Sequence, residues 1–188
     1  MMKPTVYVFL FDDFIDWEVA YVMPGLIHSG KAKVATFSLD GKKVVSAGGL
    51  KIRPDMSKKE VKVDENAILI LPGGVPWEEQ KITGIESLVK QFLEEGMAVG
   101  AICAATTYLG QLGALEEVTH TSNGLNYLKE YVPDYQGESL YVDVPAVQSG
   151  KVVTASGTSA VEFAKEIFSI TRAYTDEEIE EWYLLYRM

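Results

Sequence analysis

Short apolar runs alternate along this chain with stretches in which apolar residues recur every three or four positions. The runs at 5–11, 33–39, 67–71 and 97–102 are short and rich in β-branched or small residues, which is typical of strands. The run Ala67–Leu71 is continuously apolar, as expected of a central strand buried on both faces. Weaker strands are predicted at 139–147 and 152–155.

Helical periodicity fills the segments between these strands. Asp13 is predicted to cap a helix with one apolar face, which Pro24-Gly25 should kink or split. That face comprises Ile15, Val19, Val22 and Leu26. Further helices are predicted at 85–92, directly after Cys103, at 125–128, from Thr158 or Ser159 to Phe168, and at 179–186. Asp40-Gly41 is a hairpin signal that leads into 42–46. Strands that alternate with helices favour a mostly parallel sheet with helices on both faces.

Composition and charge narrow the class of protein. A chain of 188 residues is most simply one domain, spanning residues 1–188. The net charge of −10 argues against nucleic acid or an anionic membrane as a partner, because no basic surplus exists to neutralise phosphates. One cysteine cannot form an internal disulfide, so a reducing cytoplasm is the expected location. The start, Met1-Met2-Lys3-Pro4, does not read as a signal peptide, and no apolar run approaches the roughly 20 residues needed to cross a bilayer. No phosphate loop or metal-ligand spacing is present, so we expect no cofactor and no metal.

The single cysteine, Cys103, lies where a predicted strand passes into a predicted helix. Sulfur at such a junction is near free backbone N–H groups and the positive end of a helix dipole, which favour thiolate over thiol. The arrangement has the geometry of a nucleophile elbow. The alternative is a buried cysteine that only fills the core.

Three further features are expected at the carboxyl ends of the strands, where ligands bind in such sheets. Glu18 lies on the helix after the first strand, Gly73-Gly74 ends the central strand, and His120 follows the cysteine helix in an extended stretch. Each also has a structural interpretation. Glu18 would be a solvated helix residue, the glycines a turn, and His120 a hydrogen-bonded structural histidine.

Taken together, these segments resemble the ThiJ/PfpI family of the class I glutamine amidotransferase-like superfamily, whose members include the parkinsonism-linked protein deglycase. The resemblance runs nearly end to end. It is carried by Asp12–Glu18, Leu71-Pro72-Gly73-Gly74, Gly100–Thr106, Val118-Thr119-His120 and Ala155–Ala164. It implies a flavodoxin-like three-layer sandwich and, commonly, a homodimer. The aromatic residues of the last helix would pack on that partner or within the core.

The resemblance also implies roles at matching positions. Cys103 matches the reactive cysteine, Glu18 the protonated glutamate that hydrogen-bonds its sulfur, and His120 a histidine near the cysteine in several members. The Gly73-Gly74 turn and Ala104 match the region that binds the substrate, with oxyanion-binding amides at Gly74 and Ala104. Like-charge repulsion and burial are expected to raise the pKa of the glutamate so that it can donate to sulfur.

Two departures restrict the function that the resemblance implies. Ala104 stands where protease-like members have a histidine, which weakens assignment as an intracellular peptidase and leaves His120 or a neighbouring subunit to supply the base. No histidine follows His120, which disfavours glutaminase chemistry. We therefore expect an enzyme that acts on a small carbonyl or acyl substrate, of glyoxalase, deglycase or hydrolase type. The alternative is a redox-sensing stress protein in which Cys103 is oxidised.

Overall fold

The computed structural model describes residues 3–187, so Met1 and Met2, at the start considered for a signal peptide, lie outside the described residues. Seven strands form one sheet in the order β5-β2-β1-β6-β7-β9-β8. All neighbouring pairs in it are parallel except β8 with β9. The strands are β1 (Thr5–Phe9), β2 (Lys33–Ser38), β5 (Met56–Ser57), β6 (Ala67–Leu71), β7 (Ala98–Ile102), β8 (Ala146–Ser149) and β9 (Val152–Ala155). The predicted mostly parallel, flavodoxin-like α/β fold is confirmed.

The centre of the sheet is buried because its strands have no polar face. Every residue of β6 and of β7 is buried, which matches their continuously apolar sequences. Parallel pairing aligns these two strands with β1 and β9, so their carboxyl ends meet at one edge of the sheet. That edge is where the sequence places Gly73 and Cys103.

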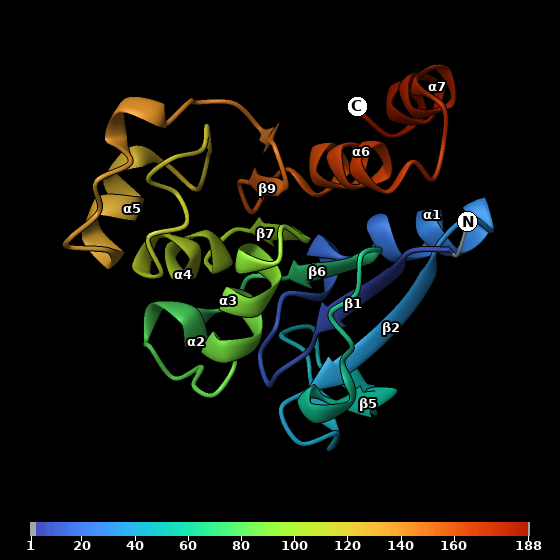
Figure 1. Ribbon diagram of the computed structural model, residues 1–188, viewed down its shortest axis with the longest axis horizontal. Helices are drawn as coiled ribbons and strands as arrows, with labels where there is room; N and C mark the ends of the chain where they lie inside the picture. The colour runs from blue at the N-terminus through green and yellow to red at the C-terminus, as the bar shows by residue number, and fades with distance from the viewer. Residues whose placement is uncertain (1–2, 188) are drawn as a thin grey trace.

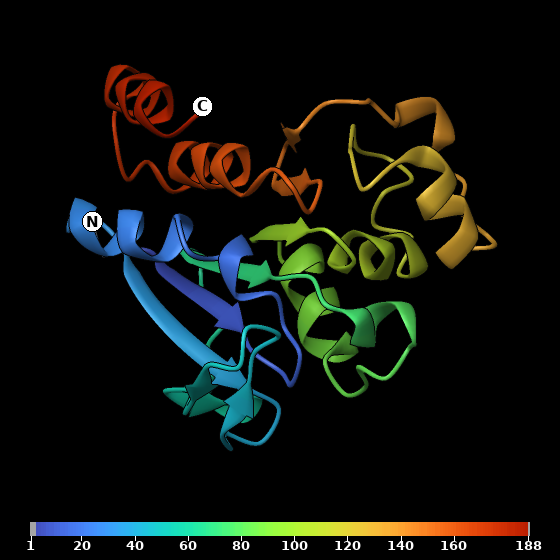
Figure 2. The ribbon, with the colours of Figure 1, turned by 180° about the vertical axis from the view of Figure 1, so that it is seen from behind.

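Helices cover both faces of the sheet (Figures 1 and 2). One face carries α6 and α1, which pack against each other, with α7 outside them. The other face carries α3, with α2 and α4 next to the carboxyl ends of the central strands. The helices are α1 (Val22–Ser29), α2 (Val75–Glu78), α3 (Glu86–Glu94), α4 (Ala105–Gln111), α5 (Leu125–Tyr131), α6 (Ala160–Thr171) and α7 (Asp176–Tyr186). Short 3-10 helices occur at η1 (Asp16–Glu18), η2 (Lys58–Glu60) and η3 (Glu138–Leu140). No helix within residues 3–187 is long and apolar enough to span a membrane.

The prediction that a helix begins at Asp13 is wrong. Asp13 has a left-handed backbone (φ 66°), and its N–H donates to Val45 O at 2.8 Å. The Asp12 carboxylate accepts the Val45 N–H in turn. These bonds hold the segment as a loop, and only the 3-10 helix η1 and then α1 follow. Pro24 does not split α1, because it lies in the first turn, where a missing N–H breaks no helical bond.

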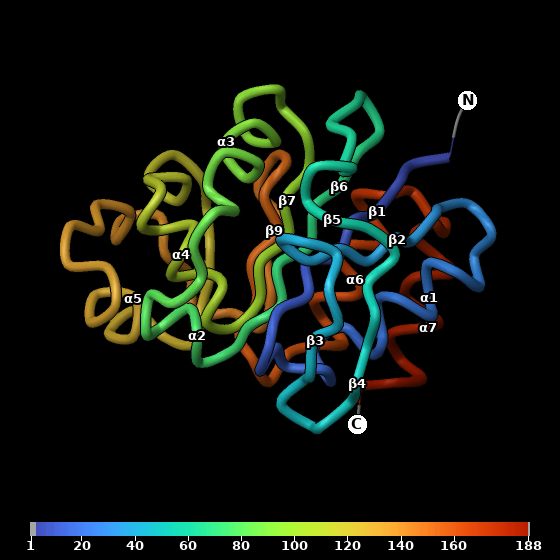
Figure 3. The backbone as a smooth tube through the Cα atoms, turned by 90° about the horizontal axis from the view of Figure 1, so that it is seen from below, coloured from blue at the N-terminus to red at the C-terminus, as the bar shows by residue number. Residues whose placement is uncertain are grey.

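Two of the predicted strand assignments also need correction. The turn at Asp40-Gly41 does not fold β2 into a hairpin, because β1 and β5 already pair with β2 in parallel. Instead β3 (Val44–Val45) pairs antiparallel with β4 (Lys51–Ile52) as a separate hairpin. This hairpin lies at the end of the sheet away from the N-terminus (Figure 3). The strand predicted at 139–147 is mostly η3 and loop, with β8 beginning only at Ala146.

Candidate active site

Cys103 lies at the sharp turn between β7 and α4. Its backbone is left-handed (φ 59°), a conformation that costs a non-glycine residue roughly 1–2 kcal/mol. The turn is held on both sides, because the Cys103 N–H donates to Ala155 O and its carbonyl accepts from the Thr106 N–H and hydroxyl. The side chain is partly exposed. The structure therefore has the strained strand-to-helix turn of a nucleophile elbow.

Glu18 is fully buried beside this turn. Its Oε2 accepts the Gly73 N–H at 2.5 Å, and its Oε1 is buried without a hydrogen-bond partner among the described residues. A Cβ placed on Gly73 would lie 2.6 Å from Cys103 Cβ and about as close to both Glu18 oxygens, at 2.9 and 3.0 Å. Only glycine fits there, so the carboxyl group and the cysteine side chain can lie against each other. The structure thus brings together residues more than eighty positions apart in the sequence.

The protonation of the Glu18 carboxyl group and that of the Cys103 thiol depend on each other. Burial raises the pKa of Glu18 from 4.5 to about 7, against the lowering effect of the Gly73 N–H. Burial, and then the charge of an ionised Glu18, raise the pKa of the Cys103 thiol from 9.0 to about 12. The two groups therefore do not both ionise near neutral pH, and the pair keeps one proton. A free thiolate beside an ionised Glu18, at neutral pH, is excluded by the same effects.

Hydrogen-bond donors surround both the sulfur and the carboxyl group. The Asn123 side-chain amide donates to Cys103 Sγ at 3.3 Å, and the Ala104 N–H also lowers the pKa of the thiol. Ionised Glu18 accepts the Gly73 N–H, and a Cys103 thiol beside it also lowers its pKa, but no other described residue hydrogen-bonds its Oε1. An unpaired buried anion is costly, whereas a protonated Glu18 can donate to sulfur. Protonated Glu18 beside a Cys103 thiolate is the state on which the proposal below is built.

Asn123 connects the elbow to the loop that precedes α6. Its Oδ1 accepts the Gly157 N–H at 2.8 Å while its amide nitrogen bonds the sulfur. A Cβ on Gly157 would lie 2.6 Å from Cys103 Sγ, so the loop approaches the sulfur only because residue 157 is glycine. Asn123 was not among the residues predicted from the sequence to lie at the site. The polar stretch Thr121–Asn123, which follows His120 before a helix, was the available signal.

Tyr127 and Glu78 form a second pair missed by the sequence analysis. The Tyr127 hydroxyl donates to Glu78 Oε1 at 2.6 Å, which joins α5 to α2. Burial, the bond to Glu78 and that carboxylate's charge raise the pKa of Tyr127, and a smaller contribution comes from the charge of Cys103. These effects keep the Tyr127 phenol neutral.

His120 is fully buried but is not bonded to Cys103. Its Nδ1 lies 2.7 Å from Val118 O, which can only accept, so Nδ1 carries the proton and Nε2 accepts from the Tyr135 hydroxyl. The rings of Tyr135 and Tyr141 pack edge-on against it. Burial lowers its pKa, which keeps the imidazole neutral. Both ring nitrogens are thus engaged away from the sulfur, and the catalytic role of His120 stays a prediction.

The turn residues predicted to bind an oxyanion have different surroundings. The Gly73 N–H is occupied by Glu18, so this residue positions the carboxyl group. The N–H groups of Gly74 and Ala104 donate to no backbone carbonyl among residues 3–187. They follow β6 and β7, which are neighbours in the sheet. Their predicted role in holding an oxyanion is therefore retained as part of the proposal below.

Comparison with known proteins gives consistent findings. The sequence matches the DJ-1/PfpI family model over residues 4–170. It is 35% identical over 193 residues to a Bacillus subtilis protein named uncharacterized protease YoaZ, covering 98% of this chain and 91% of that protein. It is 34% identical over 127 residues to the Caenorhabditis elegans glutathione-independent glyoxalase DJR-1.2, covering 66% of this chain and 65% of that protein. A thiJ/pfpI family protein from Bacillus anthracis superposes with a TM-score of 0.94 at 35% identity, covering 100% of this chain and 92% of that structure.

Proposed function

The chain belongs to the DJ-1/PfpI family, and within it we propose a cysteine-dependent enzyme that acts on a small carbonyl or acyl substrate through Cys103. The observation that carries the proposal is the buried Glu18 carboxyl packed beside a strained, partly exposed cysteine. Relatives named as a protease and a glyoxalase support cysteine chemistry in general. The small-molecule substrate is the specific part of the proposal.

The first chemical step uses groups already in place. Cys103 thiolate attacks the electrophilic carbon, forming a carbon–sulfur bond while the carbonyl π electrons move to oxygen. The N–H groups of Gly74 and Ala104 would stabilise that oxyanion, and Glu18 would then give it the proton it holds. No outside oxidant or reductant enters this addition. Asn123 keeps a hydrogen bond to sulfur until the bond forms.

The test compares turnover by three proteins. Methylglyoxal and simple thioesters or esters are offered to the native chain, to Cys103→Ser and to Glu18→Gln. Turnover by the native chain that is abolished in Cys103→Ser and reduced at least roughly tenfold in Glu18→Gln supports the proposal. Alkylation of Cys103 by iodoacetamide at neutral pH is measured on the same proteins. Faster alkylation of Glu18→Gln would show that Glu18 suppresses the thiolate, which contradicts the proposal.

A redox-sensing protein is the second candidate. The donors that surround the sulfur, Asn123 and the Ala104 N–H, would equally bind oxygen atoms added to sulfur during oxidation. The chain has no second cysteine to form a resolving disulfide. Selective gain of oxygen at Cys103 at low peroxide, with no turnover of any carbonyl substrate, would favour this function over the enzyme.

A further inference from the structure

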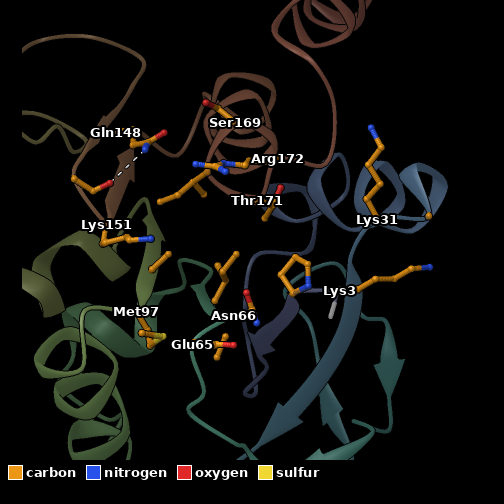
Figure 4. A pocket seen from close by; sticks show the side chains of 17 residues that line it. Lys3, Lys31, Glu65, Asn66, Met97, Gln148, Lys151, Ser169, Thr171 and Arg172 are labelled. Carbon is orange, nitrogen blue, oxygen red and sulfur yellow. Dashed lines mark hydrogen bonds between the residues drawn. The ribbon is translucent and has the colours of Figure 1, made fainter. Parts of the chain in front are cut away.

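A second concave site lies at the opposite edge of the sheet from Cys103. A cavity of about 760 Å³ opens beside the amino ends of the central strands, where it is lined by Pro4, Ala67, Ala98 and Lys151 (Figure 4). Cys103 follows the carboxyl end of β7, whose five residues separate the two edges by roughly 16 Å. The volume falls within the range of small-molecule sites, about 300–1,000 Å³. The cavity is therefore independent of the candidate active site.

The residues that line this cavity carry a net positive charge, whereas the whole chain is negatively charged. The chain has 27 acidic and 17 basic residues, yet four basic residues and one acidic residue, Glu65, line the cavity. The basic residues are Lys3, Lys31, Lys151 and Arg172. Within residues 3–187, none of these four forms an ion pair, although five other lysines do. Unpaired cations gathered at a hollow favour an anion there.

Arg172 occupies a backbone position at which glycine is the usual residue. Two helix ends line the cavity, and both end in a left-handed cap: Gly30 after α1 (φ 63°) and Arg172 after α6 (φ 52°). Glycine adopts this conformation without strain, whereas arginine does not. Figure 4 shows the Arg172 and Lys151 side chains directed into the cavity from two sides, while Lys3 and Lys31 extend outward at its rim. The guanidinium is thus held at the cavity despite a strained backbone.

The remaining wall can accept an apolar part of a ligand. Ile68, Met97 and Ile170 line the cavity between the charged groups, and Ser169 adds a hydroxyl at its edge. A planar guanidinium binds phosphate oxygens through two parallel hydrogen bonds, and a lysine adds a point charge. We propose that this cavity binds a phosphate ester of nucleotide size, with Lys151 and Arg172 on the phosphate groups and the apolar wall against the organic part.

Another explanation of the basic residues is electrostatic. Arg172 and Lys31 follow helix C-termini, whose carbonyls attract cations whether or not a ligand binds. Arg172→Gly separates the two explanations. It relieves the left-handed strain and removes the guanidinium, so it should keep the thermal unfolding midpoint at or above that of the native chain while weakening phosphate binding.

The experiment is calorimetric titration of the full chain at low ionic strength with ADP, pyrophosphate and adenosine. Saturable binding of ADP and pyrophosphate, but not of adenosine, is expected. Arg172→Gly and Lys151→Gln should each weaken ADP binding roughly tenfold to a hundredfold. The control is Lys51→Gln, which removes an exposed lysine of β4 outside the cavity and should not change binding. Cys103 alkylation, measured in parallel, should stay at the native rate in all three variants.

Two results would overturn the proposal. One is the absence of saturable binding by either phosphate probe. The other is equal weakening by Lys51→Gln and by the two cavity variants, which would show that only overall charge matters. Because Cys103 chemistry is read separately, failure of the phosphate site leaves the proposed enzyme function untouched, and the reverse also holds.

Discussion

Replacing Glu18 by glutamine should make the protein more stable above neutral pH. Glutamine keeps an oxygen for the Gly73 N–H but cannot ionise. In the unfolded chain a glutamate loses its proton near pH 4.5, whereas in the fold burial raises the pKa of Glu18 to about 7. Between these values the folded protein binds more protons than the unfolded chain, so its stability falls as pH rises.

The magnitude follows from the same two pKa values. A tenfold change in proton affinity corresponds to about 1.4 kcal/mol, so native stability should drop by about 3 kcal/mol between pH 4.5 and 8 because of this residue alone. Glu18→Gln should lack that drop. Other titrating groups, His120 included, contribute equally to both proteins, except Cys103, whose pKa responds to the Glu18 charge. The difference between the two pH profiles therefore reports the Glu18–Cys103 pair.

The assay is urea unfolding of both proteins at pH 5 and pH 8. Glu117→Gln is the control, because Glu117 is an exposed glutamate. The native chain and the control should both lose stability between the two pH values through Glu18. The reasoning is refuted if Glu18→Gln follows the native profile within experimental error. It is also refuted if the variant is less stable than the native chain at pH 8, because a stabilising charged Glu18 would then be required.

Three further predictions concern the surroundings of the sulfur. Asn123→Ala should slow Cys103 alkylation at neutral pH roughly tenfold, since a donor to the thiolate is lost; an unchanged rate would remove Asn123 from the site. Gly157→Ala should destabilise the protein by about 1–3 kcal/mol and block alkylation, because its Cβ would meet the sulfur. Gly96→Ala, where a Cβ meets nothing, is the control: it should lose only about 1 kcal/mol through its left-handed backbone and keep full alkylation. Burial lowers the His120 pKa, so native stability should fall as pH drops below 6.5. His120→Gln should flatten that fall in acid unfolding curves. Turnover by the same variant tests the predicted catalytic role of His120, and unchanged turnover would exclude that role.

Local patterns were sufficient for the layers of the fold and for the elbow. Continuous apolar runs such as Ala67–Leu71 can be satisfied only by burial on both faces, and this implies parallel strands between two layers of helices. The junction at Cys103 was visible because a small-residue strand passes directly into a helix. These features depend on neighbouring residues alone, so a sequence reveals them.

Predictions of secondary structure from the sequence failed where long-range hydrogen bonds override the local conformational preference of a segment. Aspartate commonly caps helices, yet the hydrogen bonds of Asp12 and Asp13 to Val45 hold Asp13 in a loop. The Asp40-Gly41 turn suits a hairpin, yet β1 and β5 already flank β2. Competition of this kind is decided by partners far away in the chain, which no local pattern specifies.

By itself, the sequence determined that a cysteine stands at a strained turn and that Glu18, Gly73 and Gly74 lie at the same edge of a parallel sheet. Only the tertiary structure decided which groups touch the sulfur. It placed Asn123 there and kept both nitrogens of His120 on Val118 and Tyr135. The physical reason is that side-chain contacts depend on distances of a few tenths of an ångström, which are set by packing of the whole chain rather than by residue order.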